Sequence, residues 1–457
     1  MSVHVIAILV LVVAFVIATL LPINLGAISL VAAFLIGSLV LDGPPDDIAD
    51  KIFADFPGNL FVILVGVTFL FAIARANGTV DWLIQLAVRG VRGRIALIPW
   101  IMFAVTGVLT AFGAVVPAAV AIIAPVGLGF AVRHRINPVL MGLSIINGAS
   151  AGGFSPLSIF GVITNGVVAK SNLPGSPLTL FLGSLIFNVL LNVVVFFLFG
   201  GRELLGRVAE LEPADAASGP GGRPPGAVAT GGGPGAAQAR TSGATGAGFT
   251  EGEHPPVTTL DLNRALTLVV LVALAVGALA FQLDVGLLAV TAAVLLSLLA
   301  PHTYKGAVAQ VAWPTVLLVC GIVTYVNLLQ EIGTIKFLGD QVAKIGIPLL
   351  AALVICYIGA AVSAFASTTG ILGALIPLAV PFLLAGHVGA VGVITALAIS
   401  ASVVDSSPFS TSGALVTASA PEERRDYVYR RLMAWGFSMV AIAPAVTWLL
   451  LVVPGWL

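Results

Sequence analysis

One polar segment occurs twice in this sequence, each time inside a long apolar run. Residues 150–161 read Ser-Ala-Gly-Gly-Phe-Ser-Pro-Leu-Ser-Ile-Phe-Gly, and residues 402–413 read Ser-Val-Val-Asp-Ser-Ser-Pro-Phe-Ser-Thr-Ser-Gly. A shift of about 252 positions superposes the Ser-Pro step, the next Ser and the final Gly. Unpaired polar groups are expensive in hydrocarbon, so a helix broken at these places must be covered by protein or line a cavity. Two such breaks at matching places in two chain halves predict a binding site at the middle of a membrane.

The composition is that of an integral membrane protein. Hydrophobic residues make up 59% of the 457 residues and charged residues only 9%, whereas a soluble domain carries roughly 25% charged residues. The formal net charge is zero, which argues against a nucleic-acid partner. Cys320 and Cys356 lie in apolar runs and predict neither a disulfide framework nor a metal site.

Apolar runs of about 20 residues, the length that crosses a bilayer as a helix, divide the chain into two halves of the same plan. The first half, residues 1–200, is predicted to contain five crossing helices and one re-entrant hairpin. We expect the hairpin at about 97–131, where Gly113 to Pro117 interrupts a run too long for one crossing. The fourth crossing helix, at about 139–169, is broken by the first polar segment.

The second half, residues 262–457, repeats this plan with a hairpin at about 347–386 and a broken helix at about 388–418. Residues 201–261 connect the halves and are rich in Gly, Pro, Ala, Ser and Thr, which predicts a flexible linker. The predicted fold is therefore an all-α polytopic membrane protein with two repeats and discontinuous helices at the midplane.

The distribution of basic residues predicts an orientation. Five crossings per half is an odd number, so the two repeats enter the membrane from opposite faces and have inverted topology. With the N-terminus outside, all but four of the 20 Lys and Arg residues fall inside, as the positive-inside rule requires. We therefore expect both termini outside and the linker in the cytoplasm. The acidic stretch at 42–55 is then predicted to be an external loop.

Asp405 lies inside the second polar segment, and an ionisable residue within a membrane span is a functional candidate. Hydroxyl residues flank it, including Ser402, Ser406 and Ser407. Because hard cations prefer oxygen ligands, this stretch suits a sodium ion, or a proton relay. The structural alternative is that Asp405 caps the N-terminus of the second half-helix.

The two hairpin tips differ in side-chain chemistry. The second carries Ser367, Thr368 and Thr369, whose hydroxyls and free N–H groups can face an anion at the start of the returning helix. The first, from Gly113 to Pro117, has no side-chain oxygen and offers only backbone groups. Neither polar segment contains a basic residue, so an anion would need helix N-termini, hydroxyls and co-bound cations. That requirement couples the anion to the cation.

Two classes of function are disfavoured by what the sequence does not contain. It has no GxxxxGK[ST] phosphate loop, which argues against ATP-driven transport by this chain. Its five histidines fall in loops or at span ends, and paired carboxylates and His-Cys clusters are missing. We therefore expect no enzymatic activity and no organic cofactor.

The order hairpin, broken helix, hairpin, broken helix resembles the ion transporter superfamily. Within it the chain is similar to the divalent anion/sodium symporters, and more closely to the MatC-type dicarboxylate carriers. Ser367-Thr368-Thr369 resembles that family's Ser-Asn-Thr tip motif, and Ser155-Pro156 and Ser407-Pro408 resemble its Thr-Pro step. The first tip departs from the motif. The resemblance implies sodium-driven uptake of a di- or tricarboxylate by an elevator movement, in a homodimer in the cytoplasmic membrane.

The residues and the resemblance together give two sets of candidate site residues. The predicted substrate-binding residues are Ser155, Pro156, Ser367, Thr368, Thr369, Ser407 and Pro408. The predicted sodium ligands are Thr110, Asn147, Ser150, Gly153, Ser363, Ala366, Thr368, Asp405 and Ser406.

Other functions stay open at this stage. A cation/proton antiporter of the same superfamily would use Asp405 to exchange sodium for protons. A related transporter would carry another anion, such as sulfate, arsenite or an aromatic acid. Sodium-dependent binding of a carboxylate separates the symporter, with C3 and C4 dicarboxylates as its expected substrates, from both alternatives.

Overall fold

The structure is a computed structural model. It describes residues 3–21, 23–41, 43–54, 56–89, 94–207, 260–281, 283–301, 304–334, 337, 347–364, 368–384 and 388–455. All regular elements in these ranges are helices, which confirms the predicted all-α class. Most of the predicted linker, from 208 to 259, lies outside the described residues.

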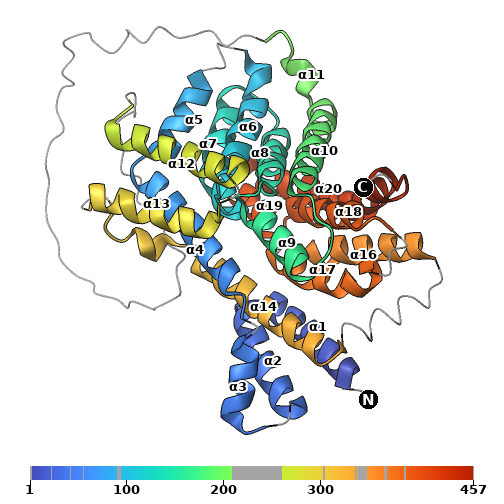
Figure 1. The fold of residues 1–457 in the computed structure, drawn as a ribbon. Helices are drawn as coiled ribbons and strands as arrows, with labels where there is room; N and C mark the ends of the chain where they lie inside the picture. Colours follow the sequence, from blue (N-terminus) through green and yellow to red (C-terminus); the bar gives the residue numbers. More distant parts are fainter. Residues whose placement is uncertain are drawn as a thin grey trace, which may run out of the picture.

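The first half of the chain forms eleven described α-helices (Figure 1). They are α1 (Val3–Leu20), α2 (Leu25–Val40), α3 (Pro45–Ala54), α4 (Gly58–Ala76), α5 (Thr79–Arg89), α6 (Ile98–Ala111), α7 (Val116–Arg133), α8 (Pro138–Gly152), α9 (Ile159–Lys170), α10 (Pro177–Leu198) and α11 (Gly201–Leu204).

One expectation for this half was wrong. The acidic stretch is not a plain loop, because α3 occupies most of it. Asp46 and Asp47 lie in its first turn and Lys51 in its last, where they complement the helix dipole. The sequence of α3 is amphipathic, and Ile48 and Ile52 are buried.

The described helices of the second half follow the same order. They are α12 (Leu262–Ala280), α13 (Val285–Leu299), α14 (Trp313–Glu331), α16 (Pro348–Ser363), α17 (Thr368–Leu384), α18 (Ala390–Val403), α19 (Thr411–Ser419) and α20 (Glu422–Thr447), with the 3₁₀ turn η3 (Val404–Ser406) between α18 and α19 and the π-helical turn η4 (Trp448–Val452) after α20.

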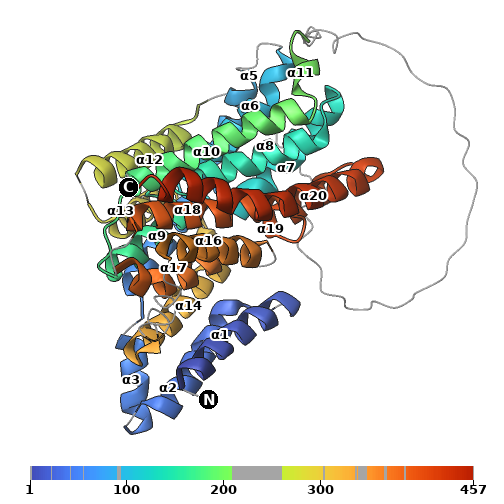
Figure 2. The same cartoon turned by 90° about the vertical axis from the view of Figure 1, so that its right-hand side faces the viewer.

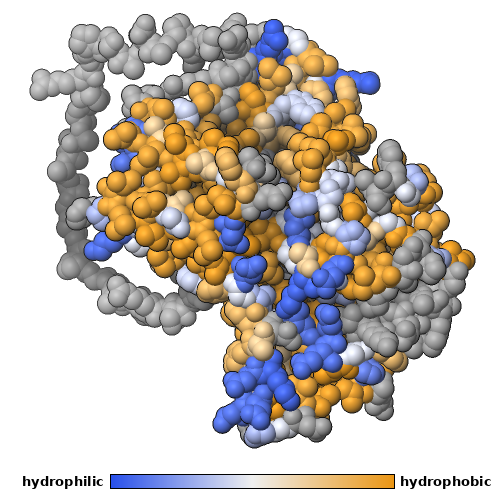
Figure 3. Space-filling model, in the orientation of Figure 1, coloured by the Kyte–Doolittle hydropathy of each residue, from blue (hydrophilic) through white to orange (hydrophobic). Residues whose placement is uncertain are grey.

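The exterior is that of a membrane protein. Among the described residues, six helical stretches are long and apolar enough to cross a bilayer: Gly58–Ala76, Val116–Arg133, Pro177–Leu198, Trp313–Glu331, Ala390–Ser419 and Glu422–Val452. Figure 3 shows a broad apolar surface over α12 and α13, whereas hydrophilic residues gather over α3. Exposed Leu39 and Leu298 illustrate side chains that only lipid would cover.

Two helix crossings pair one half of the chain with the other. Helix α14 packs on α2, and α4 packs on α13. At the first crossing a Cβ on Gly321 would overlap the carbonyl oxygen of Gly26; at the second a Cβ on Gly66 would come within 2.8 Å of the carbonyl oxygen of Gly286. Each crossing joins the ninth residue of the long helix to the second residue of its partner. This exchange is what two repeats related by a two-fold axis would produce, although inverted topology itself stays a prediction.

The apolar core separates into parts. The largest buried cluster joins the hairpins, the broken helices, α10 and α20, and it also includes residues of α4, α5 and α14. Smaller clusters join α1, α2 and α3 with α14, and α4 with α12 and α13. Figures 1 and 2 show α1, α2 and α3 standing apart from the helices that carry the breaks. The elements that contain the candidate site therefore share one core.

Candidate functional site

The two polar segments break their helices in the same way. Helix α8 ends at Gly152 and α9 begins at Ile159; α18 ends at Val403, and η3 and a turn precede α19. The predicted discontinuous helices are therefore confirmed. The helices break here because of the Ser, Gly and Pro residues: Pro interrupts the helix, and the Ser side chains form hydrogen bonds with the backbone of the turn.

Equivalent hydrogen bonds hold both turns. In the first, the Ser155 hydroxyl accepts from the N–H of Leu157 at 3.2 Å, and the Ser155 carbonyl accepts from the N–H of Ser158 at 2.9 Å. In the second, 252 positions later, Ser407 accepts from Phe409 at 3.3 Å and from Ser410 at 3.0 Å. The two breaks are copies of one local structure.

A glycine closes each turn. A Cβ on Gly161 would overlap the carbonyl oxygen of Ser155, and a Cβ on Gly413 would overlap that of Ser407. Both glycines lie in the first turn of the second half-helix, where the backbone folds back against the turn. A side chain at either position would force the half-helix away from the break.

The second break differs from the first through Asp405. Its carboxylate accepts a hydrogen bond from the Ser412 hydroxyl at 2.7 Å, and its carbonyl oxygen accepts one from Ser410. Ser410 is the N-cap of α19, with its hydroxyl 3.3 Å from the N–H of Gly413. Asp405 is therefore not the helix cap. It is only 5% exposed, and among the described residues no basic side chain pairs with it.

The first hairpin packs its tip on the first break. Helices α6 and α7 are its arms, and the chain turns at residues 112–115. The Ser155 hydroxyl donates to the carbonyl of Ala111 at 2.8 Å. A Cβ on Gly152 would overlap the Thr110 hydroxyl, so α8 and α6 touch at backbone distance. Thr110 itself donates to the carbonyl of Thr106 at 3.0 Å.

The second hairpin reaches the second break through hydroxyls. The Ser363 hydroxyl donates to the carbonyl of Ala401 at 2.7 Å and lies 2.9 Å from the hydroxyl of Thr368. Thr368 also donates to Ala401, at 3.5 Å. Ser363, Thr368 and Ala401 are all buried, and Thr369, the next residue, is 6% exposed. Ala366 and Ser367 lie outside the described residues.

The predicted residues thus form two groups, one at each break. Thr110, Ser150 and Gly153 lie at the first; Ser363, Thr368 and the residues Asp405 to Pro408 lie at the second. Packing between the halves joins the groups: α7 contacts α19, α9 contacts α17, and α8 contacts η3. The sequence placed Ser412 among the hydroxyls that follow Asp405 but did not single it out as the partner of the carboxylate. The carbonyl of Ala401, which Ser363 and Thr368 share as acceptor, had no signal in the sequence.

This arrangement can bind a cation and an anion without a basic side chain. Asp405, hydroxyls and helix-end carbonyls supply oxygen ligands for a small hard cation. The first turns of α9 and α19 supply free N–H groups and the positive ends of two helix dipoles for an anion. Among the described residues there is no group of three or more His, Cys, Asp and Glu that could hold a transition metal.

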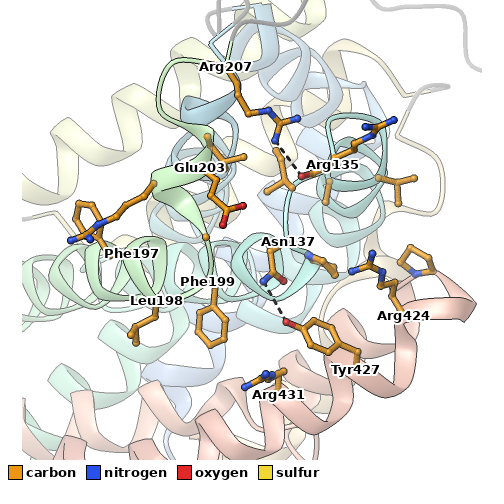
Figure 4. Close-up of a pocket in the computed structure, with 18 of the residues that line it drawn as sticks. Arg135, Asn137, Phe197, Leu198, Phe199, Glu203, Arg207, Arg424, Tyr427 and Arg431 are labelled. Carbon is orange, nitrogen blue, oxygen red and sulfur yellow. Dashed lines mark hydrogen bonds between the residues drawn. The ribbon is translucent and has the colours of Figure 1, made fainter.

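A basic cavity of about 920 Å³ opens where α8 begins, next to the end of α10, α11 and the first turns of α20. Figure 4 shows arginines around this opening, with Asn137 and Tyr427 between them. Its charged lining residues are Arg135, Arg202, Arg207, Arg424, Arg431, Glu203 and Glu423. The excess of arginine gives the cavity a positive potential that attracts anions.

Local strain and packing shape this cavity. Arg135 has φ 51°, a left-handed conformation that favours glycine. Arg207 donates to the carbonyl of His134 at 2.9 Å.

Partial burial, and then the charges of Arg133 and Arg207, lower the pKa of His134. Sequence analysis did not predict the cavity; the only signal was basic residues near three separate span ends.

Comparison with known proteins agrees with the fold. The model of the dicarboxylate carrier protein MatC N-terminus matches residues 1–153, and the citrate transporter model matches residues 269–454. The YdaH transporter of Alcanivorax borkumensis, whose crystal structure was described as having an unusual topology, is similar with a TM-score of 0.59. That match has 12% identity and covers 93% of this chain and 97% of the other, so it supports the fold alone. No curated protein matches significantly.

One family match falls on each half of the chain. The second match includes a hairpin and the whole broken helix, whereas the first match includes a hairpin and ends at the first break. They indicate a carrier of small anionic carboxylates, not an enzyme. The two matches together thus indicate an integral membrane secondary transporter of the dicarboxylate and citrate type, in agreement with the resemblance to MatC-type carriers.

Proposed function

We propose that this protein couples sodium entry to uptake of a di- or tricarboxylate, with C3 and C4 dicarboxylates preferred. The observation that carries the proposal is Asp405, a carboxylate 5% exposed at a helix break and held by Ser412 instead of a basic residue. A buried carboxylate without a countercharge is costly, and a bound cation offsets that cost. The cation then reduces repulsion for an incoming anion in the same pocket.

We assign the cation to two groups of ligands and the substrate to the turns and the second tip. Ser363, Thr368, Asp405 and Ser406, with Ala366, would hold one sodium ion, and Thr110, Asn147, Ser150 and Gly153 another. The carboxylates of the substrate would contact the Ser155-Pro156 and Ser407-Pro408 steps, Ser367, Thr368 and Thr369. Helix N-termini at both breaks complement the negative charge.

The separate cores support an elevator mechanism. Hairpins, broken helices, α10 and α20 share most of one cluster, which also reaches α4 and α14, whereas the buried residues of α1, α2, α12 and α13 lie in the other two. In our proposal the first group moves with its cargo against the second, which holds a homodimer in the cytoplasmic membrane. The termini would be outside and the basic cavity inside, where it attracts carboxylates on the cytoplasmic side.

Thermal stabilisation of the purified protein tests this function. Malonate, malate, succinate, citrate and sulfate are each added in sodium chloride or in choline chloride of equal ionic strength. A ligand at about 100 times its Kd stabilises the folded state by about 2.7 kcal/mol. We expect stabilisation by C3 or C4 dicarboxylates in sodium only. Stabilisation by sulfate alone indicates another anion as substrate, and stabilisation by sodium without any anion effect indicates an antiporter.

A further inference from the structure

Helices α8 and α10 bury polar side-chain atoms that have no hydrogen-bond partner among the described residues. On α8 these are the hydroxyls of Ser144 and Ser150 and the amide nitrogen of Asn147. On α10 they are the amide oxygen of Asn188 and both amide atoms of Asn192. All five residues are at most 2% exposed. Buried polar groups are normally hydrogen-bonded, so this cluster requires an occupant.

The two helices face each other in a defined register. The Ser184 hydroxyl of α10 lies 3.4 Å from the carbonyl of Ser150 near the end of α8. Pro138, the first residue of α8, lines the basic cavity together with Phe199, just after α10. The helices therefore run antiparallel, and the residue one turn after Ser184 on α10, Asn188, lies at the level of α8 just before Ser150.

Asn188 is held in an orientation that leaves its oxygen available. Its amide nitrogen donates to the carbonyl of Ser184 at 2.9 Å and to the Ser184 hydroxyl at 3.3 Å. The amide oxygen is then the free end, fully buried and directed at no donor among the described residues. An unpartnered oxygen fixed by its own nitrogen is suited to a cation.

The second half of the chain supplies an internal comparison. The 252-residue shift places Ser144 on Ala396 and Asn147 on Ile399, both apolar and buried. The corresponding helix pair, α18 and α20, buries Ser400 and Thr447, whose hydroxyls pair with each other at 2.8 Å. Apart from the indole nitrogen of Trp435, the described residues of α18 and α20 bury no side-chain polar atom without a partner, so this helix packing does not need those on α8 and α10.

We propose that α8 and α10 enclose a site for a small hydrated monovalent cation, with the oxygens of Ser150 and Asn188 as direct ligands. Water held by Asn147, Asn192 and Ser144 completes its shell. The C-terminal end of α8 adds its partial negative charge. This site rests on the proposed sodium coupling. It revises the ligands proposed for the sodium ion at the first break, because α10 supplies the side-chain oxygen that the first hairpin tip lacks.

Sodium titration of the melting temperature tests the site. The full-length protein and its Asn188→Leu, Asn192→Leu and Asp405→Asn variants are melted without carboxylate, in sodium and choline mixtures of constant ionic strength. We expect Asn188→Leu to raise the half-maximal sodium concentration roughly tenfold, which corresponds to about 1.4 kcal/mol, and Asn192→Leu to raise it less. Asp405→Asn removes only the part of the sodium response that belongs to the other proposed cation group, and the double variant Asn188→Leu/Asp405→Asn loses the response altogether.

Stability in choline separates a binding role from a packing role. Leu removes the buried amide oxygen that has no partner, and the Ser184 hydroxyl keeps its bond to the carbonyl of Ser150, so Asn188→Leu should melt in choline at the wild-type temperature or above it. Thr447→Val, the control in the other half, breaks a satisfied pair and should lower the melting temperature equally in both salts. A similar uniform loss in Asn188→Leu, or an unchanged sodium response, overturns the site alone. A wild-type protein insensitive to sodium overturns the coupling and this site together.

Discussion

Gly26 of α2 and Gly321 of α14 cross with their backbones in contact, because neither carries a side chain. A methyl group on Gly321 would overlap the carbonyl carbon and oxygen of Gly26, atoms that cannot rotate away. The crossing joins two helices almost 300 residues apart in the chain. Close packing of small residues is a main source of helix association in lipid. It also joins the first half of the chain to the second.

Gly321→Ala should therefore destabilise the protein. Forcing one extra carbon into packed backbone costs about 1–3 kcal/mol, and we expect a lower melting temperature. Gly129→Ala is the matched control, because a Cβ at this helical glycine meets nothing within 4 Å. Ala should leave that position neutral or more stable by about 0.5–1 kcal/mol. Equal melting temperatures for the two variants would contradict the crossing.

Ser410→Ala should cost more stability than Ser158→Ala, although the two serines occupy equivalent positions. The Ser410 hydroxyl caps α19 and donates to the carbonyl of Ser407 at 2.6 Å. The Ser158 hydroxyl is buried without a partner among the described residues. Loss of the first should cost about 1–2 kcal/mol, and loss of the second close to nothing. Thermal melting of both variants in one buffer measures the difference, and an equal loss would show that the breaks do not differ in this way.

Asp405→Asn should weaken the dependence of carboxylate binding on sodium. The amide still accepts a hydrogen bond from Ser412, but it lacks the charge that attracts a cation. The measurement is the sodium concentration at half-maximal stabilisation with a saturating dicarboxylate. Asp284→Asn is the control, because Asp284 caps α13 through a bond from the N–H of Leu287 and lies far from the breaks in the chain. Unchanged sodium activation in Asp405→Asn would remove this carboxylate from the cation site.

Thr368→Val should lower affinity for sodium and dicarboxylate while changing side-chain volume little. It removes a hydroxyl that lies 2.9 Å from Ser363, at the start of α17. Thr324→Val removes a hydroxyl of similar burial that bonds only its own helix, to Cys320 at 2.8 Å. We expect binding to fall roughly tenfold for the first variant, or about 1.4 kcal/mol, and to stay unchanged for the second. Comparable affinities would argue against a role for the second hairpin tip.

Arg135→Gly should separate stability from charge at the basic cavity. Glycine accepts the left-handed backbone of this residue, so the variant should be at least as stable as the wild type. It also removes one positive charge from the lining, which should slow carboxylate binding from the cavity side at low ionic strength. Stopped-flow binding at low and high salt measures the effect. Lower stability together with unchanged kinetics would contradict both parts.

The breaks and hairpins could be predicted because their signal is local. Ser, Gly and Pro inside a long apolar run mark a helix that cannot continue, and the 252-residue repeat showed that two places obey the same rule. The residues that complete each break could not be predicted, because distance along the chain hides them. The Ser155 hydroxyl donates to the carbonyl of Ala111, 44 positions away, and the Ser363 hydroxyl donates to that of Ala401, 38 positions away.

Two other features show where sequence reasoning stopped. The acidic residues in the stretch 42–55 suggested a loop. The same stretch contains Ile48 and Ile52, which have helical spacing and form one buried face of α3. The polar residues of α10 recur every fourth position, Ser184, Asn188 and Asn192, but their significance depends on which helix they face. Only the packing of α8 against α10 supplies that information.

The exchange of partners between halves has a consequence for synthesis. Helix α7 of the first half packs on α19, and α9 packs on α17, so each half completes the other. While the ribosome is still translating the linker, the first broken helix has been inserted but lacks these neighbours. A nascent first half must therefore wait in the bilayer, with its polar turn shielded by its own hairpin through Ser155 and Ala111, until the rest of the protein arrives.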